Sequence, residues 1–176
     1  VMEPVRGGAL VRSVPEEIQK MYEAGAPDRS AAEWAFRWLL DKPEFMTILS
    51  GMSNIEQADD NLRIFDAAEA GCLSDAEKAT LENVRRAYEA RIRVGCTGCQ
   101  YCMPCPQGIN IPGIFRSYDT ASMFGDFTGF RKSYNAMETK ADACVGCEAC
   151  VAACPQHFAT PIPEMLRRIH EENYAK

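Results

Sequence analysis

The sequence predicts a mainly α-helical chain. Helix-forming residues dominate its 176 residues, and runs of β-branched residues are scarce. Ser30, Ser53 and Ser74 are each followed three residues later by glutamate, a pattern typical of the capping box at a helix start. The length suits one ordinary domain or two small ones, and 47% hydrophobic residues can supply a core.

Before residue 95 we expect four helices. The first starts with a proline in its first turn, and the others follow the three capping boxes: residues 15–24, 30–41, 53–71 and 74–94. Apolar side chains recur at helical spacing in the last three, which predicts one buried face on each. These side chains are Trp34, Trp38 and Leu39, then Ile55, Ala58, Leu62 and Phe65, and finally Leu81, Val84, Tyr88 and Ile92.

Two short segments are expected to be strands. Residues 1–10 read as a strand that runs into a turn at Arg6–Gly8, and the apolar run Phe45–Leu49 reads as a buried strand. Two strands are too few for an independent sheet. We therefore interpret residues 1–71 as the tail end of an α/β domain whose other strands are missing.

Eight of the nine cysteines form two runs in the second half of the chain. Three cysteines at two-residue gaps are followed by a fourth that precedes proline, as in the bacterial ferredoxin run, whose fourth cysteine ligates the other cluster of a pair. This pattern predicts two 4Fe–4S clusters with crossed ligands. The predicted metal ligands are Cys96, Cys99, Cys102 and Cys154 for one cluster and Cys144, Cys147, Cys150 and Cys105 for the other.

Zinc is the competing interpretation of the cysteine runs. Structural zinc needs four ligands in all, usually as two separate pairs. Here each run carries a third cysteine at the same gap, so clusters are favoured. The first run is one residue short, with only Met103 and Pro104 before its last cysteine, which makes Cys105 the weakest of the eight assignments.

The cysteine half also contains an internal repeat. Cys105-Pro106-Gln107 is followed by Ile111-Pro112, and Cys154-Pro155-Gln156 is followed by Ile162-Pro163. Each copy predicts a ligand loop, a proline turn and a helix. The helices expected in this half cover residues 113–123, 127–137 and 163–174, with His170 facing solvent on the last one.

Composition and charge limit the classes of partner that this chain can have. A formal charge of −6 without a basic run argues against a nucleic-acid partner. No apolar run is long enough to span a bilayer, so no membrane partner is expected. An odd number of closely spaced cysteines, without a signal peptide, favours metal ligation in a reducing, cytoplasmic setting over disulfides.

The first seventy residues resemble the last βα units of an aldo/keto reductase. The resemblance rests on Ser30–Leu40, Pro43, Thr47–Ser53, Gln57 and Asn61, and with the cysteine half it points to the ferredoxin-containing branch of that family. It implies a (β/α)8 barrel that binds NADP(H), of which this chain would hold an incomplete C-terminal piece. The residues implied to line the adenosine phosphate end are Ser50, Gly51, Met52, Ser53, Gln57 and Asn61.

In that family a loop like Glu3–Gly8 contacts the pyrophosphate. Nothing in this sequence matches the family's catalytic Tyr, Lys, Asp and His, so we assign no catalytic residue and do not expect the chain alone to reduce carbonyls.

We expect three parts along the chain: barrel residues at 1–71, a connecting helix at 72–94 and a ferredoxin-type domain at 95–176.

The expected function is electron transfer between the clusters and an NAD(P)H-linked barrel. The expected partner is a redox protein or the missing half of the barrel. In the alternative interpretation the clusters, or zinc, only stabilise a structural or interaction module.

Overall fold

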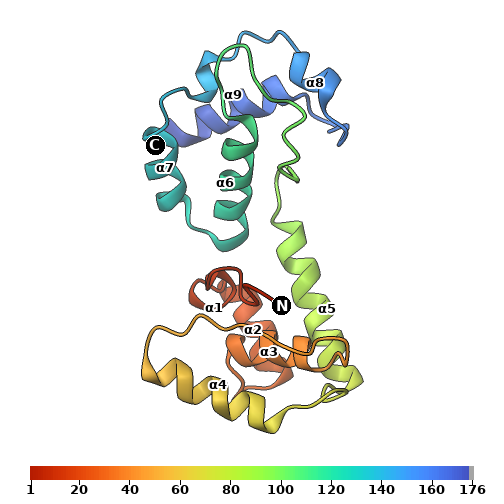
Figure 1. The fold of residues 1–176 in the computed structure, drawn as a ribbon. Coiled ribbons are helices and arrows are strands. Elements are labelled where there is room, and N and C mark those ends of the chain that lie inside the picture. The colour runs from red at the N-terminus through yellow and green to blue at the C-terminus, as the bar shows by residue number, and fades with distance from the viewer. Residues whose placement is uncertain (175–176) are drawn as a thin grey trace. The chain divides into compact units, whose positions relative to one another are not determined.

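The computed structural model describes residues 1–174, and these residues form helices and no strand (Figure 1). The prediction of a mainly α chain is therefore confirmed. The chain divides into two compact units, one of Val1–Glu89 and a second that starts at Ala90. The three-part division after residues 71 and 94 stays a prediction. Among the described helices, none combines the length and the apolar character that a membrane span requires.

Three of the four helices expected in the first unit begin where their sequence signals place them. Ser30 Oγ accepts the backbone N–H of Glu33 at 3.0 Å, and Ser74 and Glu77 bond reciprocally as a capping box. The helix cap predicted at Ser53 lies one residue later in the structure, because the side chain of Asn54 accepts the Gln57 N–H instead. The helices of this unit are α1 (Ala9–Arg12), α2 (Glu16–Gly25), α3 (Ala31–Leu40), α4 (Ile55–Ala67) and α5 (Asp75–Ala90).

Both predicted strands are wrong. Residues 4–8 form turns that lead into α1, and Phe45–Leu49 is extended but largely exposed, with Met46 96% accessible. The two segments still meet: the Val1 amino group donates to Thr47 O at 2.6 Å, and Leu49 N–H donates to Val1 O at 2.9 Å. Val1 thus donates to one residue and accepts from the second residue after it, which is the hydrogen-bond pattern of parallel strands. Only this one residue of the N-terminal segment takes part. A lone pair of segments has no further strand to extend or cover it, so no sheet forms.

The buried faces of the first unit also differ in part from the expectation. Trp34 is fully buried, but Trp38 is 45% exposed and lies under the Lys42 ammonium. On α4 the inward side chain is Ile64, whereas Ile55 and Leu62 are 73% and 69% exposed. Sequence spacing finds an apolar stripe, but which stripe packs inward depends on the neighbouring helices. The core side chains of this unit are Ile18, Tyr22, Trp34, Phe36, Leu39, Ile64, Leu73, Val84 and Tyr88.

A buried carboxylate joins α3 to α4. Glu33, which is 5% exposed, accepts Arg37 Nε at 2.8 Å and Arg63 Nη2 at 2.7 Å. Burial acts to raise the pKa of Glu33, but the hydrogen bonds from Arg63 and Arg37 outweigh it and hold the pKa below its usual value. The group thus stays charged and bridges the two helices.

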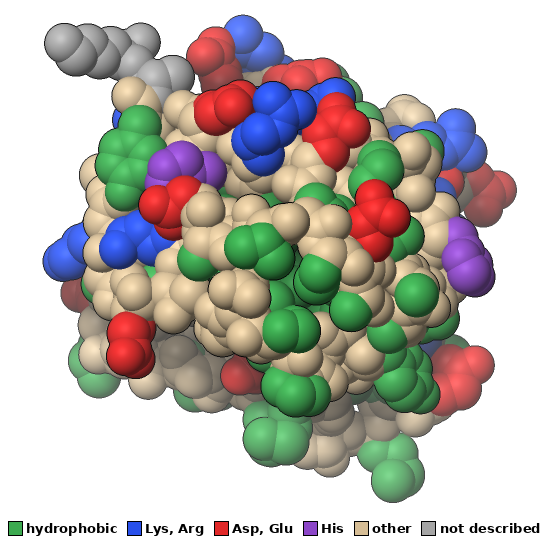
Figure 2. Space-filling view, turned by 90° about the horizontal axis from the view of Figure 1, so that it is seen from above, with side chains coloured by type: hydrophobic (Ala, Val, Ile, Leu, Met, Phe, Trp, Pro, Cys, Tyr) green, Lys and Arg blue, Asp and Glu red, His purple; other side chains and the backbone are tan. Residues whose placement is uncertain are grey.

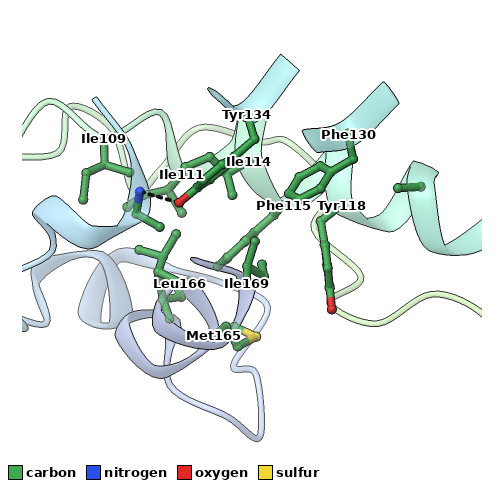
Figure 3. Close-up of a cluster of buried hydrophobic side chains, with 13 residues drawn as sticks. Ile109, Ile111, Ile114, Phe115, Tyr118, Phe130, Tyr134, Met165, Leu166 and Ile169 are labelled. Carbon is green, nitrogen blue, oxygen red and sulfur yellow. Dashed lines mark hydrogen bonds between the residues drawn. The ribbon is translucent and has the colours of Figure 1, made fainter. Parts of the chain in front are cut away.

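The second unit is organised around α6 (Ile111–Phe124), most of whose side chains are buried. Figure 3 shows residues of α6 meeting Phe130 and Tyr134 of α7 and Leu166 and Ile169 of α9 in one core. The remaining elements are α7 (Phe127–Asn135), the 3-10 turn η1 (Ala141–Ala143), α8 (Ala149–Ala153) and α9 (Ile162–Tyr174). The three helices expected here are therefore confirmed.

The predicted repeat is visible in the structure. Both α6 and α9 begin at the isoleucine of an Ile-Pro pair, Ile111 and Ile162, and both isoleucines are buried. Proline in the first helical turn loses no hydrogen bond and presets the backbone. His170 on α9 faces solvent only in part, because its Nδ1 lies 2.9 Å from the buried hydroxyl of Tyr134.

Candidate metal centre

The eight run cysteines lie at two hollows of the second unit. The first hollow is lined by Cys96, Cys99, Cys102 and Cys154, here named the first quartet. The second hollow is lined by Cys105, Cys144, Cys147 and Cys150, the second quartet, with Cys102 also at its edge. Each quartet thus draws three cysteines from one run and its fourth from the other. The weakest assignment from sequence, Cys105, lies with the second run.

The two runs share left-handed backbone at two equivalent positions. Gly98 and Gly146 occupy equivalent positions and have φ of +71° and +69°, and the residues after the second cysteines, Gln100 and Glu148, have φ of +66° and +59°. The left-handed region favours glycine, so each run turns sharply at the glycine. A Cβ on Gly98 would also meet Arg116 Cδ at 2.9 Å. The turn lets the cysteines on either side face the same hollow.

The hollows have apolar walls and one open side. Phe115, Phe158 and Ile162 line the first hollow, and Ile109 and Leu166 line the second. Cys99 and Cys147 are exposed, whereas the other six cysteines are partly buried. Figure 2 shows hydrophobic side chains, a colour class that includes cysteine, grouped on one face with charged side chains toward its edges. Exposed apolar side chains beside the runs are Tyr101, Val145 and Val151.

The thiols influence one another electrostatically. Burial raises the pKa of Cys96, Cys102 and Cys150, and neighbouring cysteines of both runs raise it further. The N–H of Gly98 acts in the opposite direction on Cys96 by hydrogen bonding to its sulfur. Several thiolates gathered in an apolar hollow repel one another, and a bound cationic group offsets that repulsion. The donor set therefore fits a thiolate-ligated metal group.

The cysteine spacing, rather than the placement of the sulfurs, favours a cluster over a single ion. Within residues 1–174, no three Cys, His, Asp or Glu side chains converge closely enough to hold one metal ion. Structural zinc needs four ligands around one atom, whereas a 4Fe–4S cluster takes its four thiolates around a larger group.

The residues expected to contact NADP(H) line one cavity of about 500 Å³ in the first unit. Asn61 Nδ2 donates to Ser50 Oγ at 2.7 Å, and Gln57 Oε1 accepts the Ser53 N–H at 2.9 Å. The cavity is also lined by Gly7 and Gly8 of the N-terminal turns. Arg12, which the sequence did not single out, lies beside them and donates to Gly7 O at 2.6 Å.

Two anchoring side chains of the metal centre were also missed from sequence. The Asp119 carboxylate accepts backbone N–H groups just before Cys96, and the Tyr134 hydroxyl accepts the Ala141 N–H just before Cys144. Neither residue lies in a motif. The one signal was a polar group on an otherwise buried helix face, Asp119 on α6.

Comparison with known families agrees with this division of the chain. Residues 9–86 match the aldo/keto reductase family, and residues 95–159 match a 4Fe-4S dicluster domain. No curated protein and no solved structure matches the chain. The matches support iron-sulfur cluster binding and an electron-transfer role, and they fit a mainly α chain that contains part of a barrel fold. The chain thus joins a segment that matches the aldo/keto reductase family to a segment that matches a 4Fe-4S dicluster domain.

Proposed function

We propose that the second unit carries two 4Fe–4S clusters, one on each quartet, and relays electrons between them and NAD(P)H chemistry on a reductase barrel. The observation that carries the proposal is the composition of the two hollows. Each is lined by one quartet, three cysteines from one run and one from the other, and Cys102 of the first quartet also reaches the edge of the second hollow. This is the crossed arrangement of a two-cluster ferredoxin.

The residues of this chain supply the setting for the clusters. Phe115 and Leu166 keep water from the inner side of the hollows, and the Gly98 N–H bonds to a ligand sulfur. Hydrogen bonds to sulfur and restricted solvent both tune the potential of such groups. When bound, each cluster supplies reversible one-electron transfer. Cys99 and Cys147 bring each quartet to the surface, where electrons can be exchanged with a partner.

The cavity of the first unit supports the nicotinamide half of the proposal. The loop Ser50–Ser53, of small residues apart from Met52, leads into the N-terminus of α4, a position suited to an anionic group. We assign this cavity to the adenosine phosphate end of NADP(H). The partner of the relay is a redox protein or the rest of a reductase barrel.

Iron and sulfide analysis of anaerobically prepared protein tests the clusters. The complete chain should bind about eight iron and eight sulfide, and both Cys99→Ser and Cys147→Ser should leave about half of that content or perturb the spectrum of one cluster. Cys72→Ser is the matched control. Cys72 lies in the first unit with its sulfur 3.8 Å from Arg37 O, so its loss should not change the iron content. Stoichiometric zinc without iron would contradict the proposal.

The same variants separate the alternative, in which the clusters only stabilise the fold. Electron transfer from dithionite to an artificial acceptor should fall in Cys99→Ser and Cys147→Ser while circular dichroism still reports folded helices. If both variants unfold and the remaining folded protein transfers electrons at the wild-type rate, the stabilising role is correct.

Titration with NADPH tests the cavity. Asn61→Ala removes the bond to Ser50 and should weaken NADPH binding several-fold. Gln19→Ala on α2 is the control and should not, because Gln19 bonds to Glu23 and does not line the cavity. Equal affinities of the two variants would contradict the cavity assignment and leave the cluster proposal intact.

A further inference from the structure

The backbone that leads into the first run is held by one buried carboxylate. Asp119 of α6, only 7% exposed, accepts three consecutive backbone N–H groups. The donors are Arg93 at 3.1 Å, Val94 at 2.8 Å and Gly95 at 2.9 Å. Gly95 directly precedes Cys96, so the carboxylate fixes the chain at the first ligand of the first quartet. Bonds from N–H groups to a charged acceptor are among the stronger ones.

The second run is held at the equivalent place by a neutral group. The hydroxyl of Tyr134, fully buried in the core, accepts the Ala141 N–H at 3.0 Å, as the dashed line in Figure 3 marks. Ala141 opens the η1 turn that ends directly before Cys144. The two runs therefore turn alike at Gly98 and Gly146, but the group that holds the backbone before the first ligand is charged in one run and neutral in the other.

Other charges near the runs are exposed. Arg116 lies along Gly98 but faces solvent, and Glu148 at the second hollow is also exposed. The Arg93 guanidinium is neutralised by Glu172 at 2.9 Å. Water and salt screen exposed charges, whereas a buried carboxylate acts through a medium of low polarity. Asp119 is therefore the charge that most distinguishes the two quartets.

We propose that Asp119 is a positioning residue of the first quartet and lowers the reduction potential of the cluster bound there, so that the first electron enters the cluster of the second quartet. The inference rests on the two-cluster function proposed above. The step moves one electron from a reductant such as dithionite to one cluster, with no bond made or broken and no proton transferred. A negative charge opposes added electron density, and net charge is one determinant of cluster potentials.

A redox titration followed by electron paramagnetic resonance tests the inference on the complete, cluster-loaded chain. Signals are assigned to the quartets by Cys99→Ser and Cys147→Ser. In Asp119→Asn the potential of the first-quartet cluster should rise and that of the second should stay. Asp119→Glu keeps the charge and should restore a potential close to that of the wild type. Glu138→Gln removes an exposed charge from the same unit and is the control.

Three results would overturn the inference. Equal shifts of both clusters in Asp119→Asn, or no shift of either, contradict the local effect of Asp119. If the first electron enters the first-quartet cluster of the wild-type protein, the inference is wrong. This measurement needs no variant, so it also decides the question if Asp119→Asn fails to fold. Absence of a second cluster in the wild type would instead contradict the proposed function itself.

Discussion

Replacing Tyr134 with phenylalanine should destabilise the second unit by about 2 kcal/mol. The side chain is fully buried, and its hydroxyl bonds to the Ala141 N–H at 3.0 Å and to His170 Nδ1 at 2.9 Å. Burial raises the pKa of Tyr134, so this hydroxyl stays neutral. Phenylalanine preserves the packing but leaves a buried backbone N–H without a partner, which costs about 1–3 kcal/mol.

The consequence should reach the metal centre, because Ala141 opens the turn that presents Cys144. Thermal unfolding of the anaerobic, cluster-loaded protein should show a midpoint lower by roughly 10 °C. A chelator should also remove iron from the second quartet faster than from the first.

Tyr174→Phe is the matched control for this prediction. The Tyr174 hydroxyl donates to Asn135 Oδ1 at 2.8 Å, but the residue is 54% exposed, so water replaces the lost bond. This variant should change stability by no more than about 0.5 kcal/mol. If the two variants unfold at the same temperature, the hydroxyl of Tyr134 does not anchor the second run and the reasoning fails.

Two further predictions concern the first unit. Glu77, whose hydrogen bonds to Ser74 and ion pair with Arg29 lower its pKa to about 2, should contribute about 1–2 kcal/mol of stability that is present above pH 4.5 and is lost as the pH falls toward 2. The free energy of unfolding of Glu77→Gln should therefore fall less steeply than that of the wild type between pH 4.5 and about pH 2. A pH profile parallel to that of the wild type would contradict the assignment. Glu33→Gln should destabilise the unit by about 2 kcal/mol, because two hydrogen bonds from arginine lose their charged acceptor. Denaturant unfolding measures the effect, with Glu16→Gln at an exposed pair as the control, and equal midpoints would refute it.

Local signals predicted the helices well. The caps at Ser30 and Ser74 and the Ile-Pro pairs at Ile111 and Ile162 act within one helical turn, so the sequence alone contains them. The strands failed because a strand depends on partners. Phe45–Leu49 has strand composition. Among the described residues, however, the only segment whose backbone is seen to pair alongside it is Val1.

The cysteine runs could be recognised because their chemistry requires a fixed spacing. Asp119 and Tyr134 could not, because the groups that they bond to stand in no motif relation to them, even where Tyr134 lies only seven residues from Ala141. The Asp119 carboxylate bonds to groups 24–26 residues away, and no local pattern marks that contact. Which of two apolar stripes faces inward on α4 is likewise a tertiary property, so Ile64 was missed and Leu62 was wrongly buried.

The measurement that tests the central claim most directly is a reductive titration of the anaerobic, complete chain, with electrons and paramagnetic centres counted per protein. The account predicts about two electrons per chain, one for each quartet, returned in full to an added acceptor. Uptake of one electron or none by protein that holds its full complement of metal would contradict a two-cluster electron relay.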